Sequence, residues 1–72
     1  MEQKVIELLK IVFEGAEITA ESSQENIADW DSMHQLSIAF EIEKVFNISL
    51  EPEEMSLLKS VQDIIHLIEK KL

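Results

Sequence analysis

A carboxylate, a hydroxyl and an imidazole lie within four residues near the middle of the chain, in the segment Asp31-Ser32-Met33-His34. Here a polar stretch gives way to a helical pattern, so Ser32 is predicted at the N-terminus of a helix. Unpaired backbone N–H groups and the helix dipole favour a phosphate at that position, by about 0.3 to 1 kcal/mol for an exposed anion. The segment therefore indicates a serine that can hold a phosphodiester.

The same segment also fits a purely structural role. Ser32 followed by Gln35 matches a capping box, in which the hydroxyl accepts a backbone N–H bond and the amide side chain reaches back to the cap residue. Asp31 can act as a second capping acceptor. Capping and attachment of a group do not exclude each other.

A hydrolytic triad of Asp31, Ser32 and His34 does not fit this prediction. Residues two positions apart on a helix point to different faces, so Ser32 and His34 cannot easily share a proton. No glycine-rich oxyanion loop is present, because the chain contains one glycine. His66 lies beside the apolar stripe of the last predicted helix and is interpreted as a surface or boundary histidine.

A calcium-binding loop is also excluded by its register. Asp29 and Asp31 match the first two acidic positions of an EF-hand loop. Met33 then takes the fifth position, His34 the glycine position and Phe40 the position of the closing glutamate. We predict no metal site.

The elements that must position this segment are predicted to be helical. A first helix is expected from about Glu2 to Glu14, with Gly15 as its stop. Its apolar face consists of Val5, Leu8, Leu9 and Val12. Residues 16–31 fit no helical or strand period and are predicted to form a long ordered loop. Its apolar anchors are Ile18, Ile27 and Trp30.

A second helix is predicted from Ser32 to the region of Asn47. Its apolar stripe is expected to contain Met33, Leu36, Phe40, Ile42, Val45 and Phe46. Glu41, Glu43 and Lys44 are left for solvent. Pro52 is then expected in the first turn of a short helical segment that runs over Met55, Leu57 and Leu58.

A third long helix is expected to open with Ser60 as its cap and to end near Lys70 and Lys71. Its apolar residues at helical spacing are Val61, Ile64, Ile65, Ile68 and Leu72. The predicted fold is thus an all-α bundle of three main helices and one short helix, in a single domain over residues 1–72. The long loop connects the first two helices.

Composition limits the partners that this bundle can bind. Fifteen acidic residues against six basic ones give a net charge of -9, which repels nucleic acid and anionic membranes and favours proteins with basic surfaces. No cysteine is present, so any thioester chemistry needs a sulfur from elsewhere. The N-terminal stretch lacks signal-peptide features, and no apolar run is long enough to cross a bilayer. We expect a cytoplasmic monomer.

The order of these features resembles the acyl carrier protein family. The resemblance covers nearly the whole chain and rests on the Asp-Ser-Met segment at mid-chain, the helix end EIEKVFNISL and the Ser-Val-x-Asp cap of the last helix. In that family an Asp-Ser-Leu motif opens the second helix and its serine carries phosphopantetheine, which comes from coenzyme A. The fold is a small helical bundle, and the protein is a carrier that enzymes modify and use.

Position by position, the resemblance implies roles for five residues. Ser32 is the attachment site, and Asp31 is the neighbour that the phosphopantetheinyl transferase recognises. Met33 takes the usual leucine position, where its similar volume should preserve docking. Glu41 and Glu43 correspond to the partner-facing surface of the second helix; a plain solvated face is the alternative.

The cargo is not determined by the sequence. Trp30 directly before Asp31 and Ser32 resembles the Trp-Asp-Ser start of stand-alone carriers in specialised biosynthesis, including polyketide and nonribosomal peptide pathways. His34 and Ser37 stand where fatty-acid-type carriers usually have acidic residues. The expected function is an acyl carrier for fatty acid, polyketide or other specialised biosynthesis. The alternatives are a peptidyl or aminoacyl carrier and a non-catalytic acidic adaptor.

Overall fold

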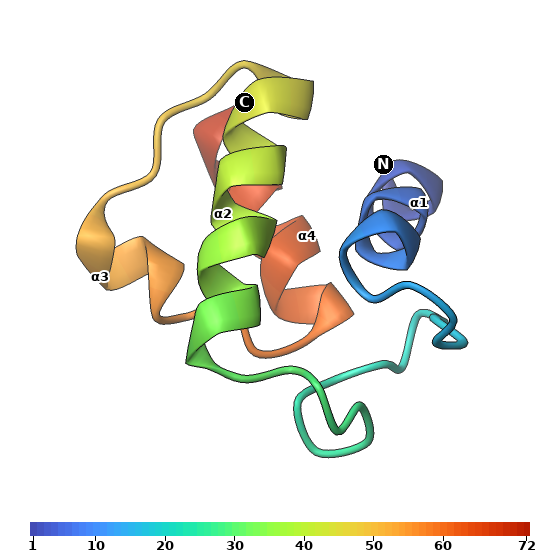
Figure 1. Ribbon diagram of the computed structural model, residues 1–72. Helices are drawn as coiled ribbons and strands as arrows, with labels where there is room; N and C mark the ends of the chain where they lie inside the picture. The colour runs from blue at the N-terminus through green and yellow to red at the C-terminus, as the bar shows by residue number, and fades with distance from the viewer.

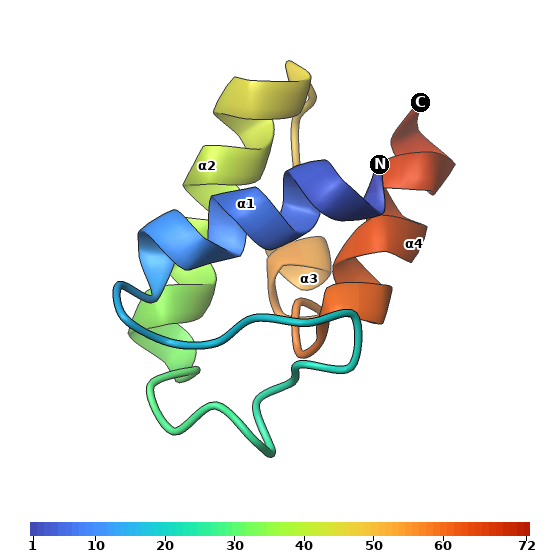
Figure 2. The ribbon, with the colours of Figure 1, turned by 90° about the vertical axis from the view of Figure 1, so that its right-hand side faces the viewer.

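A computed structural model describes residues 1–72 and contains four helices: α1 (Glu2–Val12), α2 (Ser32–Phe46), α3 (Pro52–Met55) and α4 (Val61–Lys71). Helix α1 packs on both α2 and α4, and the short α3 packs beside α2 (Figure 1). In the perpendicular view α1 crosses in front of α2 and its N-terminal end lies beside α4, and the loop that follows α1 runs below it (Figure 2). The predicted all-α fold of three main helices and one short helix is confirmed.

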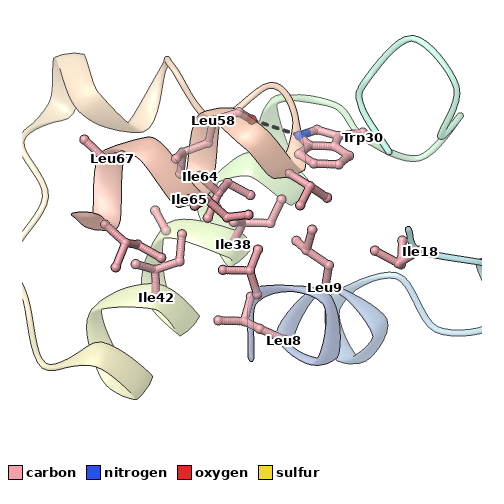
Figure 3. Packing of buried hydrophobic residues seen from close by; sticks show 14 of the residues in the cluster. Leu8, Leu9, Ile18, Trp30, Ile38, Ile42, Leu58, Ile64, Ile65 and Leu67 are labelled. Carbon is pink, nitrogen blue, oxygen red and sulfur yellow. Dashed lines mark hydrogen bonds between the residues drawn. The ribbon is translucent and has the colours of Figure 1, made fainter. Parts of the chain in front are cut away.

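The core lies where α1, α2 and α4 meet. Each long helix buries one face, because its apolar residues recur at three- and four-residue spacing. Figure 3 shows these side chains packed together between the helices. Full burial of each stabilises the fold by roughly 1.5 to 3 kcal/mol relative to exposure. The fully buried larger side chains are Val5, Leu9, Ile38, Ile42, Leu58, Val61, Ile64 and Ile68.

Helix α1 starts at Glu2 as predicted but ends at Val12, two residues earlier than expected. Phe13 leaves the helical conformation and buries its ring in the core. Gly15 then takes a positive φ of 85°, which a glycine adopts without strain. The predicted stop at Gly15 was wrong, because α1 ends at Val12 and Phe13 is its C-cap; the positive φ of Gly15 turns the chain after the helix has ended.

Helix α2 buries only part of the predicted apolar stripe, namely Ile42 and Phe46. The buried residues are Ile38, Ala39 and Ile42, and Phe46 packs partly against them. The prediction was wrong for four residues of its stripe, which are exposed: Met33, Leu36, Phe40 and Val45. The helix carries apolar residues on opposite sides, and the packing of α1 and α4 selects the side that becomes core. We call Met33, Leu36 and Phe40 the outer α2 face.

The loop between α1 and α2 is held by its apolar anchors, as predicted. Ile18 and Trp30 are buried, and Ile27 packs partly against the core. The loop is also tied to the start of α4 by an isolated antiparallel bridge between Ser23 and Ser60. These contacts give a segment without regular secondary structure a fixed path to Ser32.

The remaining helix ends follow the local chemistry of their residues. Asn47 closes α2 in the left-handed conformation with a φ of 55°. Pro52 is the first residue of α3, which ends at Met55 and does not extend over Leu57 and Leu58 as the sequence suggested. The hydroxyl of Ser60 accepts a bond from the Asp63 N–H at 3.0 Å and caps α4 as predicted. None of the four helices combines the length and apolarity required to span a membrane.

Candidate functional site

Ser32 is the first residue of α2 and is exposed to solvent. It borders a groove between α2 and α3 with a volume of about 360 Å³, which we call the α2–α3 groove. The groove is lined by Ser32, Gln35, Leu36, Pro52, Met55 and Ser56. The Ser32 hydroxyl therefore stands where the positive end of a long helix meets a partly apolar surface depression.

Asp31, and not Ser32, caps this helix. The Asp31 carboxylate accepts a hydrogen bond from the backbone N–H of His34 at 3.0 Å. The predicted capping box of Ser32 and Gln35 was wrong, because the Gln35 side chain donates to the backbone carbonyl of Leu58 at 2.9 Å. The serine hydroxyl is thus not used by the helix end and remains available for chemistry.

His34 holds the same carboxylate with its side chain. The distance from His34 Nδ1 to Asp31 Oδ1 is 2.9 Å, and the two groups form an i,i+3 ion pair when the imidazole is charged. The backbone N–H bond from His34, followed by the side-chain bond from His34, lowers the pKa of the Asp31 carboxyl from its ordinary value of 3.8. Asp31 is therefore an anion at neutral pH, directly beside Ser32.

Two aromatic contacts fix the residues on both sides of Asp31 and Ser32. The ring of Phe13 lies 5.3 Å from that of Trp30 and 5.2 Å from that of His34, measured between ring centroids. The His34 ring stacks on Phe13 with an angle of 24° between the planes. Phe13 belongs to the core, so the end of α1 helps to position the site.

Met33 projects away from the protein, with 79% of its surface exposed. Leu36 and Phe40 on the same outer α2 face are 48% and 56% exposed. Sequence reasoning placed all three residues in the apolar stripe of the second helix and gave only Met33 a role in docking, so it missed the exposure of Leu36 and Phe40. The available signal was the number of apolar residues in α2, which exceeds what one buried face can hold.

The two acidic residues predicted to face partners have different surroundings. Glu41 is half-buried and forms an ion pair with Lys44, with Oε2 and Nζ 3.4 Å apart. Glu43 accepts a hydrogen bond from the backbone N–H of Leu50 at 2.8 Å. Glu43 therefore anchors the connection between α2 and α3 in addition to any role at the surface.

Comparison with known proteins shows the family of the chain. It is 36% identical to an acyl carrier protein of Porphyromonas gingivalis over 74 aligned positions, which cover all of this chain and 95% of that protein. It is 32% identical to an acyl carrier protein of Coprothermobacter proteolyticus, with coverage of 97% and 88%. The chain belongs to the acyl carrier protein family. No protein-family model matches the chain.

Membership of the acyl carrier protein family confirms the resemblance inferred from the sequence. A further relative with this name, from Amoebophilus asiaticus, is 29% identical and aligns with 97% of the chain. Acyl carrier proteins are carriers that enzymes use. The helical fold, the exposed Ser32 and the acidic composition of this chain are all consistent with that class.

Proposed function

We propose that the Ser32 hydroxyl carries a phosphopantetheine arm, transferred from coenzyme A by a phosphopantetheinyl transferase in the cytoplasm. On this arm the protein would present acyl or other biosynthetic intermediates to successive enzymes of fatty acid, polyketide or other specialised biosynthesis. Asp31 is the neighbouring residue that the transferase recognises. The thiol at the end of the arm supplies the sulfur that this cysteine-free chain lacks and holds the cargo as a thioester.

The observation that carries the proposal is the exposed Ser32 at the start of a 15-residue helix. The N–H of His34 is used by the Asp31 cap, whereas the N–H groups of Ser32 and Met33 have no acceptor within the protein. A phosphodiester on Ser32 Oγ would lie near these two donors and the positive end of the helix dipole. The helix end is therefore electrostatically suited to the modified serine.

The α2–α3 groove also fits the arm. Its lining combines apolar atoms of Leu36, Pro52 and Met55 with polar groups of Gln35 and Ser56. Phosphopantetheine has amide groups separated by short apolar segments, so a groove with both kinds of surface can hold it against the protein. Ser32 lies at this groove and not on the opposite side of the bundle.

Partner enzymes are proposed to dock on the outer α2 face. Exposed apolar groups next to the attachment site provide contact area, and Glu41 and Glu43 add negative charge on the same helix. Opposite charge on an enzyme surface would steer the encounter and favour rapid, reversible binding. We include Met33, Glu41 and Glu43 in this docking surface.

The direct test is the intact mass of the protein after incubation with coenzyme A, magnesium and a broad-specificity phosphopantetheinyl transferase. The wild type is expected to gain one phosphopantetheine group, and Ser32→Ala none. Ser56→Ala changes a serine in the same groove and serves as the matched control, which should be modified like the wild type. If a folded wild type stays unmodified with several transferases, the acidic adaptor function replaces this proposal.

A further inference from the structure

Two hydrogen bonds from His34 meet at one oxygen of the Asp31 carboxylate. The backbone N–H and the ring Nδ1 both approach Oδ1, at 3.0 and 2.9 Å. No protein group donates to Oδ2. Two donors of one residue thus hold one oxygen of the carboxylate, and the second oxygen accepts no hydrogen bond from the protein.

The hydrogen between the two side chains must belong to His34. An ionised carboxylate can only accept hydrogen bonds, so Nδ1 carries the hydrogen in either the neutral or the charged imidazole. The ring itself is oriented by its stacking on Phe13, which is 3% exposed and also contacts Trp30. A core residue at the end of α1 is therefore connected through His34 to the carboxylate of Asp31.

We propose that His34 is a positioning residue for the modification of Ser32. By holding Asp31 Oδ1, it presents Oδ2 to the phosphopantetheinyl transferase in one fixed orientation. This inference rests on the proposed function of Ser32 and Asp31. Without the side-chain bond, the backbone cap alone would let the carboxylate rotate about its Cβ–Cγ bond, and the transferase would have to order it on binding.

Two nearly isosteric variants separate this role from a structural one. In His34→Asn, the amide Nδ2 is bonded to Cγ as Nδ1 is in histidine, so a donor is retained. In His34→Leu the donor is lost, while leucine favours a helix more than asparagine does. If His34 acts only through helix stability, His34→Leu should be modified at least as fast as His34→Asn. If His34 positions Asp31, His34→Asn should be modified faster.

The measurement is kcat/KM of the transferase for each protein, together with its free energy of unfolding. We expect kcat/KM to fall about three- to tenfold in His34→Leu, the range for loss of one exposed charge-assisted hydrogen bond, and to stay within about twofold in His34→Asn. His66→Leu, which removes an exposed histidine from α4, is the matched control and should behave as wild type. Carbon NMR of the Asp31 carboxyl should show its pKa moving toward 3.8 in His34→Leu only.

The outcomes distinguish this inference from the function on which it rests. If the wild type is modified and His34→Leu reacts at the same rate, His34 has no positioning role and the carrier function stands. Equal slowing of His34→Leu and His34→Asn would also overturn the inference, because the retained donor would then make no difference. If the wild type is not modified at Ser32, both proposals fail.

Discussion

The indole N–H of Trp30 donates a hydrogen bond to the backbone carbonyl of Leu58, with 2.9 Å between Nε1 and the oxygen (Figure 3). The Gln35 amide donates to the same oxygen at 2.9 Å. The last loop residues before Ser32 and the first turn of α2 are therefore tied to one point between α3 and α4. This point fixes the position of Ser32 relative to the groove, although it lies more than twenty residues away in sequence.

Trp30→Phe should lower the free energy of unfolding by about 1 to 3 kcal/mol, because it removes a buried hydrogen bond and leaves space around a smaller ring. Urea denaturation followed by circular dichroism measures this loss. Gln35→Leu removes the second donor to Leu58 and should cost about 0.5 to 1.5 kcal/mol alone. The double variant leaves the carbonyl without a donor, so its loss should exceed the sum of the two. Simple additivity would contradict a shared acceptor.

Acid should destabilise the protein through Asp31 and Glu54. Glu54 Oε1 accepts the Glu51 N–H at 2.8 Å and pairs with Lys71 Nζ at 2.7 Å, and these contacts lower the Glu54 pKa from 4.5. The pKa of each carboxyl is lower in the folded protein than in the unfolded chain. Their stabilisation is therefore complete above the unfolded values near 3.8 and 4.5 and is lost as the pH falls through the folded values.

Acid also removes negative charge from the whole protein. The contribution of one carboxylate is therefore measured as the difference in stability between the wild type and a variant at each pH. Urea midpoints of the wild type and of Glu54→Gln should differ near neutral pH and converge as the pH falls through the folded pKa of Glu54, which lies below 4.5. Asp31→Asn should behave in the same way. Glu53→Gln in the same helix is the matched control, because the Glu53 side chain forms neither this hydrogen bond nor this ion pair. A pH-independent difference would mean that the charge of Glu54 does not contribute.

The sequence predicted the ends of the helices better than it predicted their buried faces. Asn47 and Ser60 act through backbone conformation or capping within a few residues, so their roles follow from local chemistry. The inner face of α2 depends on which side α1 and α4 cover. Both sides of α2 have apolar residues at helical spacing, so periodicity alone could not identify the core.

In the candidate site, too, features that depend on neighbouring residues were predicted and features that depend on the tertiary structure were not. Asp31 and Ser32 were proposed from the sequence because adjacent residues at a predicted helix start form a recognisable motif. The stacking of His34 on Phe13 and the bond from Gln35 to Leu58 were not predicted, because each joins segments that only the tertiary structure brings together. Gln35 matched a local capping pattern in the sequence, but in the structure its amide donates to the distant carbonyl of Leu58.

Substitutions in the outer α2 face should weaken binding to the transferase and have little effect on the free energy of unfolding. Leu36→Gln and Phe40→Gln are each expected to change the free energy of unfolding by less than about 0.5 kcal/mol, since both side chains are exposed. Their affinity for the transferase, measured as KM, should weaken about three- to tenfold if they lie in its contact area. Leu57→Gln removes a similarly exposed leucine outside α2 and should leave KM unchanged. A stability loss above about 2 kcal/mol, which is the cost of a core truncation, would contradict their exposed position.

Replacing Asn47 with glycine should preserve the stability of the protein, whereas replacing it with alanine should lower it. Its φ of 55° lies in the left-handed region, where a Cβ costs about 1 to 2 kcal/mol except in residues such as asparagine. Asn47→Ala should therefore lose about 1 kcal/mol of stability, and Asn47→Gly should stay close to wild type. Thermal and urea unfolding of the two variants measure the difference. Equal losses would show that the asparagine side chain, and not the backbone conformation, determines the end of α2.

Glu43 and Glu41 provide a final comparison, because the two carboxylates lie on one helix and differ in their contacts. Glu43→Ala should cost about 1 to 2 kcal/mol, since it leaves the Leu50 N–H without its acceptor. Glu41→Ala loses only an ion pair with the exposed Lys44 and should cost less than about 0.5 kcal/mol. Glu43→Gln keeps an acceptor oxygen and should recover most of the stability while removing the charge. If the proposed docking surface needs negative charge, Glu43→Gln and Glu41→Gln will both raise KM for a basic partner enzyme without unfolding the protein, whereas unchanged KM values would exclude them from that surface.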